Sequence, residues 1–144
     1  MLTDDQRQFI DDLAALLMVW TMPHNVARLY GYLQIASEPV SLDEIARDLE
    51  ISKSNAFGAA KLLEQHGNAR RIGERGTKRV LLVASDDPGA PLRRQSDALG
   101  RMAALIGERE DAVADGSARE RLSRLGRFHA QLRDAMERVI RPGG

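Results

Sequence analysis

One stretch of the chain, residues 52–66, constrains the fold more than any other. Ser52 is suited to cap a helix, because its hydroxyl can accept the amide hydrogen of Asn55 three residues later. Gly67 can then adopt the left-handed conformation that ends such a helix. The apolar residues between the two ends recur at helical spacing, at Ala56, Ala60 and Leu63. A helix this short with so narrow an apolar edge is marginal in water, so it must pack against the segments on either side.

A shorter helix is predicted directly before this stretch. Ser41 and Glu44 form a capping box that opens it, and its apolar residues are expected to face inward: Leu42, Ile45, Ala46 and Leu49. Glu50 and Ile51 provide the turn, with Ile51 as the apolar residue beneath it. A helix, a short turn and a second helix have the spacing of a helix-turn-helix.

The segment after Gly67 predicts a β-hairpin. Residues 69–74 alternate loosely between polar and apolar, and residues 78–84 are rich in β-branched and apolar side chains, with a loop containing Gly76 between them. The tip of the hairpin carries Arg75, Lys78 and Arg79. A helix-turn-helix followed by a basic hairpin is the arrangement of a winged helix.

Amphipathic helices are predicted before this region. Thr3 and Gln6 form a capping box that opens a helix through about Trp20. Its apolar face is Phe9, Ile10, Leu13, Leu16, Leu17 and Trp20. Pro23 suits the first turn of a second helix over about residues 24–35. The packing face of that helix is Val26, Leu29, Tyr30 and Leu33, with Tyr32 as a further candidate.

Turn and breaker residues at 85–91 mark the clearest boundary in the chain. Two more helices are predicted beyond it, over about residues 92–113 and 118–140, the second capped by Ser117 with Glu120 three residues later. In the last helix a heptad seam alternates by three and four: Leu122, Leu125, His129, Leu132, Met136 and Val139. The seam could be an intramolecular contact or a dimer interface, and two long amphipathic helices beside a winged helix favour the dimer.

The predicted fold is therefore mainly α with a small β-hairpin wing. It consists of a winged helix-turn-helix at residues 22–84, flanked by an N-terminal helix at residues 1–21 and a helical region at residues 92–140 that we expect to build a dimer.

The net charge of zero hides an uneven distribution. Residues 1–51 carry a net charge of −6, residues 52–83 one of +5 and residues 84–144 one of +1. The basic block coincides with the predicted second helix and hairpin, as expected of a surface that contacts phosphates.

Other classes of function have little support in the sequence. There is no cysteine, which excludes disulfides, thiolate nucleophiles and cysteine-based zinc sites. The three histidines share no ligand spacing, and no phosphate loop or nucleophile with a paired base stands out, so we expect no metal, no cofactor and no enzymatic activity. No apolar run is long enough to span a bilayer and the acidic start does not resemble a signal peptide, so we expect a cytoplasmic protein with no membrane partner.

From Met22 to about Ala84 the chain resembles the GbsR branch of the MarR-like winged-helix transcriptional regulators. The matching segments are residues 22–23, 27–33, 38–45, 51–56, 62–64 and 76–79. The resemblance implies a DNA-binding homodimer that regulates transcription, in which the N-terminal and C-terminal helices build the dimer.

The candidate DNA-contacting residues are Ser41, Ser52, Lys53, Ser54, Asn55, Phe57, Lys61, Arg75, Thr77, Lys78 and Arg79. Hydroxyl and amide side chains at the start of the second helix suit base edges in a major groove, and its two lysines suit bases or phosphates. The unpaired amides at the two helix starts are natural phosphate sites. The wing residues are expected on the backbone or in the neighbouring minor groove. Phe57 could pack on a thymine methyl or fold back beside Lys61.

The predicted partner is double-stranded DNA with a roughly palindromic operator, because two copies match a two-fold site. The alternative is a protein-interaction module whose basic surface binds an acidic protein. Trp20, His24 and Tyr30 lie near the junction of the first two helices and could form a pocket for a small cationic or aromatic effector. An aromatic core is the commoner outcome of such a cluster. His129 in the seam is expected to be a hydrogen-bonded core or interface residue.

Overall fold

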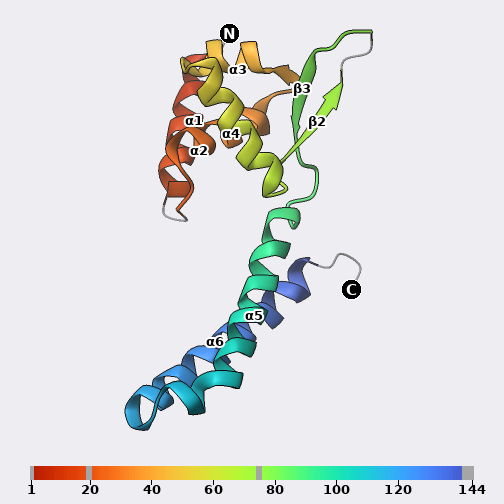
Figure 1. Ribbon diagram of the computed structural model, residues 1–144. Coiled ribbons are helices and arrows are strands. Elements are labelled where there is room, and N and C mark those ends of the chain that lie inside the picture. Colours follow the sequence, from red (N-terminus) through yellow and green to blue (C-terminus); the bar gives the residue numbers. More distant parts are fainter. Residues whose placement is uncertain (1, 19–20, 74–75, 141–144) are drawn as a thin grey trace. The chain divides into compact units, whose positions relative to one another are not determined.

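The computed structural model describes residues 2–18, 21–73 and 76–140. The chain divides into two compact units, Met1–Asp86 and Asp87–Gly144. The elements of the first unit are α1 (Asp4–Leu17), α2 (His24–Ile35), β1 (Val40–Ser41), α3 (Leu42–Leu49), α4 (Lys53–Gln65), β2 (Ala69–Gly73) and β3 (Val80–Ala84) (Figure 1). The second unit contains α5 (Ala90–Val113) and α6 (Gly116–Ile140). The predicted fold class, mainly α with a small antiparallel β-sheet, is confirmed.

α1 opens as predicted and ends earlier than predicted. Its capping box is complete: Thr3 Oγ1 accepts the Gln6 amide at 3.1 Å, and Gln6 Oε1 accepts the Thr3 amide at 2.9 Å. The helix ends at Leu17. The prediction ran to Trp20, which lies outside the described residues.

α3 and α4 form the predicted helix-turn-helix. The Ser41 hydroxyl accepts the Glu44 amide at 3.2 Å and so caps α3. At the other end of α3, Glu50 takes the left-handed conformation with φ 57°, and the Ile51 amide donates to the Ala46 carbonyl at 3.0 Å. This closure reverses the chain over the few residues between α3 and α4, which is the short turn that the sequence pattern predicts.

α4 begins and ends where the sequence predicts. The Ser52 hydroxyl accepts the Asn55 amide at 3.0 Å. At the carboxyl end Gly67 has φ 78°, and the amides of Gly67 and Asn68 donate to carbonyls of the last helical turn at 3.2 and 2.8 Å. These two bonds form a Schellman motif, in which glycine takes the left-handed position at no steric cost.

The core of the first unit forms where α2 packs against α1 and α4, and where α3 packs against α4. Its largest fully buried side chains are Ile10, Leu29, Ile45, Leu49 and Leu63. The predicted apolar edge of α4 is buried, together with Ala59. Because most of the buried α4 residues are alanines, the α4 backbone can approach α2 closely, and the opposite face of α4 is fixed toward solvent.

The predicted hairpin is present and gains a third strand. β2 and β3 pair antiparallel with Ala69 opposite Ala84, and β1 pairs antiparallel with β3 with Ser41 opposite Leu81, giving the strand order β1-β3-β2. The residue pattern does not predict β1, because a strand of two residues is too short to show an alternation of polar and apolar side chains. β1 joins the base of the wing directly to the start of α3.

In the second unit α5 and α6 lie side by side (Figure 1) and pack through small and polar residues. An ideal Cβ on Gly126 would lie 3.1 Å from the Ile106 side chain, so the two helices are in close contact there. The hydroxyls of Ser96 and Ser123 donate to carboxylates of the opposite helix at 2.8 Å each. In the described part of the chain, no helix is long and apolar enough to cross a membrane.

The predicted cap of α6 is wrong by a short distance. α6 begins at Gly116, so Ser117 lies inside the helix, and the Arg119 amide donates to the Asp115 carbonyl at 3.2 Å. A capping box requires the serine to precede the first helical residue. The positive φ of Gly116, 54°, allows the chain to turn into the helix two residues before the predicted start at residue 118.

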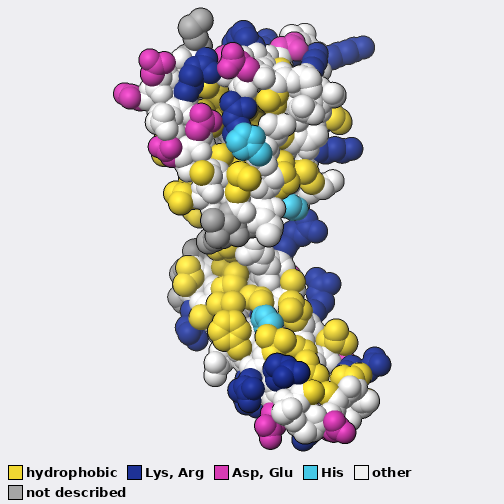
Figure 2. Space-filling view, turned by 90° about the vertical axis from the view of Figure 1, so that its left-hand side faces the viewer, with side chains coloured by type: hydrophobic (Ala, Val, Ile, Leu, Met, Phe, Trp, Pro, Cys, Tyr) yellow, Lys and Arg dark blue, Asp and Glu magenta, His cyan; other side chains and the backbone are white. Residues whose placement is uncertain are grey.

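Large apolar side chains that the patterns predict to pack are exposed. On α1 these are Phe9 and Leu16, and along the predicted seam of α6 they are Leu125, Leu132 and Val139. Phe128 on α6 and Met102, Leu105 and Val113 on α5 are exposed as well. Figure 2 shows hydrophobic side chains gathered on one face of the second unit. On α1, Ile10 is buried while Phe9 and Leu16 stay exposed in the single chain, and the exposed seam residues are not an intramolecular core.

Candidate nucleic-acid interface

The solvent-facing side of α4 carries the predicted base-contacting residues. Its exposed side chains include Ser52 at the cap and Lys53, Ser54, Asn55, Phe57 and Lys61. The buried residues Ala56, Ala60 and Leu63 hold the opposite side against the core. The rotation of α4 therefore presents Lys53 and three small polar side chains at the start of the helix, with Lys61 further along the same exposed side, as entry into a groove requires.

The sequence left two arrangements open for Phe57, a contact with a thymine methyl or a position folded back beside Lys61. The structure shows the second. The Lys61 ammonium lies 5.5 Å from the centre of the Phe57 ring, at cation–π distance. The ring stays 43% exposed. Next to it, a Cβ on Gly58 would meet nothing within 4 Å, so packing inside the protein does not require a glycine at this position.

The wing extends from the sheet between β2 and β3. Gly76 has φ 82°, a conformation that favours glycine, and the Thr77 hydroxyl accepts the Arg79 amide at 3.1 Å. Thr77, Lys78 and Arg79 are exposed. Arg75, the remaining predicted wing contact, lies outside the described residues.

Ser41 does not share this exposure. It is 3% exposed, pairs with β3 and caps α3, and its hydroxyl lies 3.3 Å from a Glu44 carboxylate oxygen. The Ser41 hydroxyl is satisfied within the protein, so the predicted phosphate contact would rest on the backbone amides at the start of α3, and it stays a prediction. Two carboxylates in the first turn of α3, Asp43 and Glu44, would repel an anion there.

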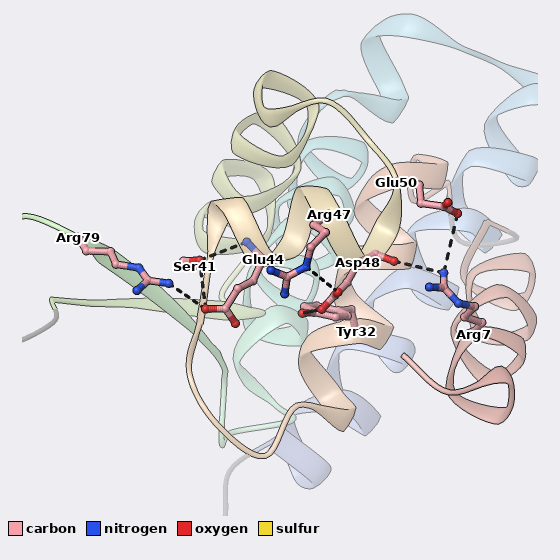
Figure 3. A network of polar contacts seen from close by, with 8 residues as sticks. All are labelled: Arg7, Tyr32, Ser41, Glu44, Arg47, Asp48, Glu50 and Arg79. Atoms are coloured by element: carbon pink, nitrogen blue, oxygen red, sulfur yellow. Dashed lines mark hydrogen bonds and ion pairs between the residues drawn. The ribbon is translucent and has the colours of Figure 1, made fainter. Parts of the chain in front are cut away.

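These two carboxylates form ion pairs that the sequence analysis missed. Lys53 Nζ lies 3.0 Å from Asp43 Oδ1. Arg79 Nη2 lies 2.9 Å from Glu44 Oε1 (Figure 3). The acidic first turn of α3 was visible in the sequence, but the Glu44–Arg79 pair depends on strand β1, which was not.

A buried polar contact fixes the other end of α3. The Tyr32 hydroxyl donates to Asp48 Oδ2 at 2.6 Å, and Arg47 Nε lies 3.4 Å from Asp48 Oδ1 (Figure 3). Arg7 and Arg28 donate to the carbonyls of Asp48 and Leu49 at 3.4 and 2.9 Å. α3 is thereby held to α1 and α2, which sets the position from which α4 leaves the turn.

The Tyr32–Asp48 contact changes the protonation of both groups. Burial and the hydrogen bond to Asp48 raise the pKa of the Tyr32 hydroxyl well above its ordinary value. Burial alone would raise the pKa of the Asp48 carboxyl, but the hydrogen bonds from Tyr32 and Arg47 outweigh it and hold that pKa below its ordinary value of 3.8. The charged form of Asp48 is therefore the one that stabilises the fold.

We expect Tyr32→Phe to destabilise the protein by about 1.5–3 kcal/mol at pH 7, because it removes a buried hydrogen bond to a charged group. Since folding lowers the pKa of Asp48, its contribution is present above pH 3.8 and is lost as the pH falls through the folded-state pKa. The difference between wild type and variant should therefore shrink in acid. Urea unfolding at pH 7 and pH 3 measures it. Tyr30→Phe on the same helix removes the same atom from a half-buried residue and is the control; equal losses in the two variants at pH 7 would contradict the assignment.

Of the three predicted effector residues, the described part of the chain includes His24 and Tyr30. His24 is exposed, and Tyr30 is half-buried and packs against the core. Trp20 lies outside the described residues. An effector site at this junction stays a prediction.

The fold of this chain is similar to that of a solved protein. A crystal structure described as a transcriptional regulator superposes with a TM-score of 0.81 at 20% identity, over 94% of this chain and 95% of the other. The transcriptional regulator Tm0710 from Thermotoga maritima gives a TM-score of 0.46 at 15% identity, over 90% of this chain and 87% of the other. A mutant of MepR from S. aureus gives 0.47 at 13% identity, over 89% of each chain.

No protein-family model matches the chain, and no curated protein matches it in sequence. The superposition over nearly the whole length of the first structure nevertheless defines the architecture. The resemblance to winged-helix regulators is confirmed at the level of the fold: a winged helix-turn-helix with helices before and after it.

Proposed function

We propose that this protein is a dimeric, sequence-specific DNA-binding regulator of transcription. The observation that carries the proposal is the exposed polar side of α4, with Lys53 at its start and Lys61 further along, in the same unit as a basic wing. α4 enters the major groove, and Ser54 and Asn55 reach base edges there. Thr77, Lys78 and Arg79 of the wing, together with Arg75, contact the backbone or the neighbouring minor groove. The fold that this chain shares with a transcriptional regulator supports the same function.

The dimer forms through the exposed apolar side chains of the flanking helices. The exposed apolar side chains of α5 and α6 leave large apolar surfaces in water, which single chains rarely tolerate. They are Met102, Leu105, Val113, Leu125, Phe128, Leu132 and Val139. A second copy offers the same face, so two copies can cover it in a two-fold arrangement. Two recognition helices then read the two halves of a roughly palindromic operator.

Selection of bound sequences from a random double-stranded DNA pool, followed by gel shift of the enriched sequences, tests the proposal. We expect retardation by sites with two related half-sites, and an affinity that falls linearly on a log–log plot against salt, with a slope of about −0.9 for each neutralised phosphate. If no sequence is enriched and no DNA is retarded at low salt, the proposal fails. The basic surface would then be better explained by an acidic protein partner.

A further inference from the structure

The two carboxylates in the first turn of α3, Asp43 and Glu44, here named the acidic pair, contact two of the cations assigned to DNA. Asp43 pairs with Lys53 of the recognition helix at 3.0 Å, and Glu44 pairs with Arg79 of the wing at 2.9 Å. Each of the two DNA-contacting elements thus has one cation that is paired with one carboxylate of the acidic pair. All four side chains retain access to solvent, so a phosphate can reach the same cations.

The fold places the acidic pair there through a specific register. Ser41 pairs with Leu81 of β3 and also caps α3, so the first turn of α3 begins beside the wing strand two residues beyond Arg79. The Lys53 side chain in the first turn of α4 extends to the first turn of α3, where its Nζ lies 3.0 Å from Asp43 Oδ1.

We propose that the acidic pair is an autoinhibitory element: in the DNA-free protein it occupies Lys53 and Arg79, and DNA phosphates must displace it. This inference rests on the proposed function. A phosphate that binds either cation breaks an existing ion pair and leaves a carboxylate close to the DNA backbone. The acidic pair therefore lowers affinity for every DNA sequence, and only a site that supplies base contacts through α4 compensates for the loss. Its role is to keep non-operator DNA from binding stably, while the ratio of operator to non-operator affinity is unchanged.

The exchange has a measurable signature in salt dependence. When a free cation binds a phosphate, the counterions condensed on the DNA are released. When the cation first leaves a carboxylate, that carboxylate takes up a counterion, and the net release is smaller. Removing the carboxylate charge should steepen the salt dependence as well as tighten binding, whereas a purely structural change in α3 would not steepen it.

The test compares Glu44→Gln, Asp43→Asn and the double variant with wild type, using the full chain, its selected operator and an unrelated duplex of the same length. Glutamine retains an oxygen that the Ser41 hydroxyl can contact. We expect each single variant to bind both duplexes about fivefold more tightly, as for the loss of one exposed ion pair. The slope of log affinity against log salt should become more negative by about 0.9 for each cation released. Asp12→Asn on α1, with the same change in net charge, is the control and should leave affinity unchanged.

A double-mutant cycle separates displacement from simple repulsion of DNA by a carboxylate. If Glu44 acts by holding Arg79, Glu44→Gln should have no effect on affinity in an Arg79→Gln background. Should Glu44→Gln lower the melting temperature, Asp43→Asn in a Lys53→Gln background repeats the test, because no capping bond from Asp43 is involved.

The outcomes distinguish the two proposals. If wild type binds an operator and both single variants bind with wild-type affinity and salt slope, the acidic pair is not inhibitory and the proposed function stands. A gain that persists in the Arg79→Gln background also overturns the displacement mechanism. If wild type binds no DNA, the proposed function fails and this inference fails with it.

Discussion

Replacing Arg75, Lys78 and Arg79 together with glutamate is expected to abolish DNA binding and leave the fold intact. Three phosphate-contacting cations become three anions, so the affinity for an operator should fall by at least about a thousandfold near physiological salt. Lys78 and Arg79 are exposed in the wing and bury no part of the core, so the melting temperature should change little. Gel shift and thermal unfolding measure the two effects.

The control for this variant reverses three cations outside the wing: Arg109, Arg121 and Arg127 on the exposed sides of α5 and α6. It has the same net charge and therefore the same long-range repulsion of DNA. A loss of binding confined to the wing variant locates the contact on the wing. If the wing variant retained wild-type affinity, the assignment of the wing to DNA would be wrong.

Replacing Leu125 and Phe128 with glutamate is expected to convert a dimer into monomers. Both side chains lie exposed on α6, with Phe128 58% exposed, so the single chain tolerates the change. In the proposed dimer they are removed from water, which is worth about 1.5–3 kcal/mol for each large apolar side chain, and a buried carboxylate adds a further cost. The dimer dissociation constant should rise at least about a thousandfold.

Light scattering at micromolar concentration measures the change in mass, and gel shift should show weaker operator binding because one copy reads only one half-site. Arg127→Glu with Gln131→Glu, at exposed polar positions of the same helix, is the matched control and should remain dimeric. A wild-type protein that is monomeric at these concentrations, or a variant that stays dimeric, would remove α6 from the interface.

The helix ends of the first unit were largely predictable because they depend on local chemistry. The caps at Thr3, Ser41 and Ser52 each require one hydroxyl three residues before an amide, and the end of α4 requires one glycine at the left-handed position. Such interactions involve only neighbours in the chain. Ser117 shows the limit: the pattern was present, but the helix starts at Gly116, two residues before the predicted start.

The candidate interface was less predictable than the helices and strands that carry it. The sequence identified the exposed residues of α4 and the wing, since the alanines on the opposite side of α4 fixed its rotation. It could not show that Ser41 is buried in a sheet, because β1 exists only through its pairing with β3. For the same reason it did not reveal that Glu44 meets Arg79 across thirty-five residues of sequence.

By itself, the sequence determined the order of the elements, their caps, the winged-helix architecture and the location of the positive charge. The tertiary structure decided which charges are paired, which of two tyrosines on α2 is buried against Asp48, and which apolar side chains stay in water. The division has a physical reason. Helix caps and periodic faces arise from interactions between residues a few positions apart, whereas ion pairs and burial depend on distances that only the packed chain defines.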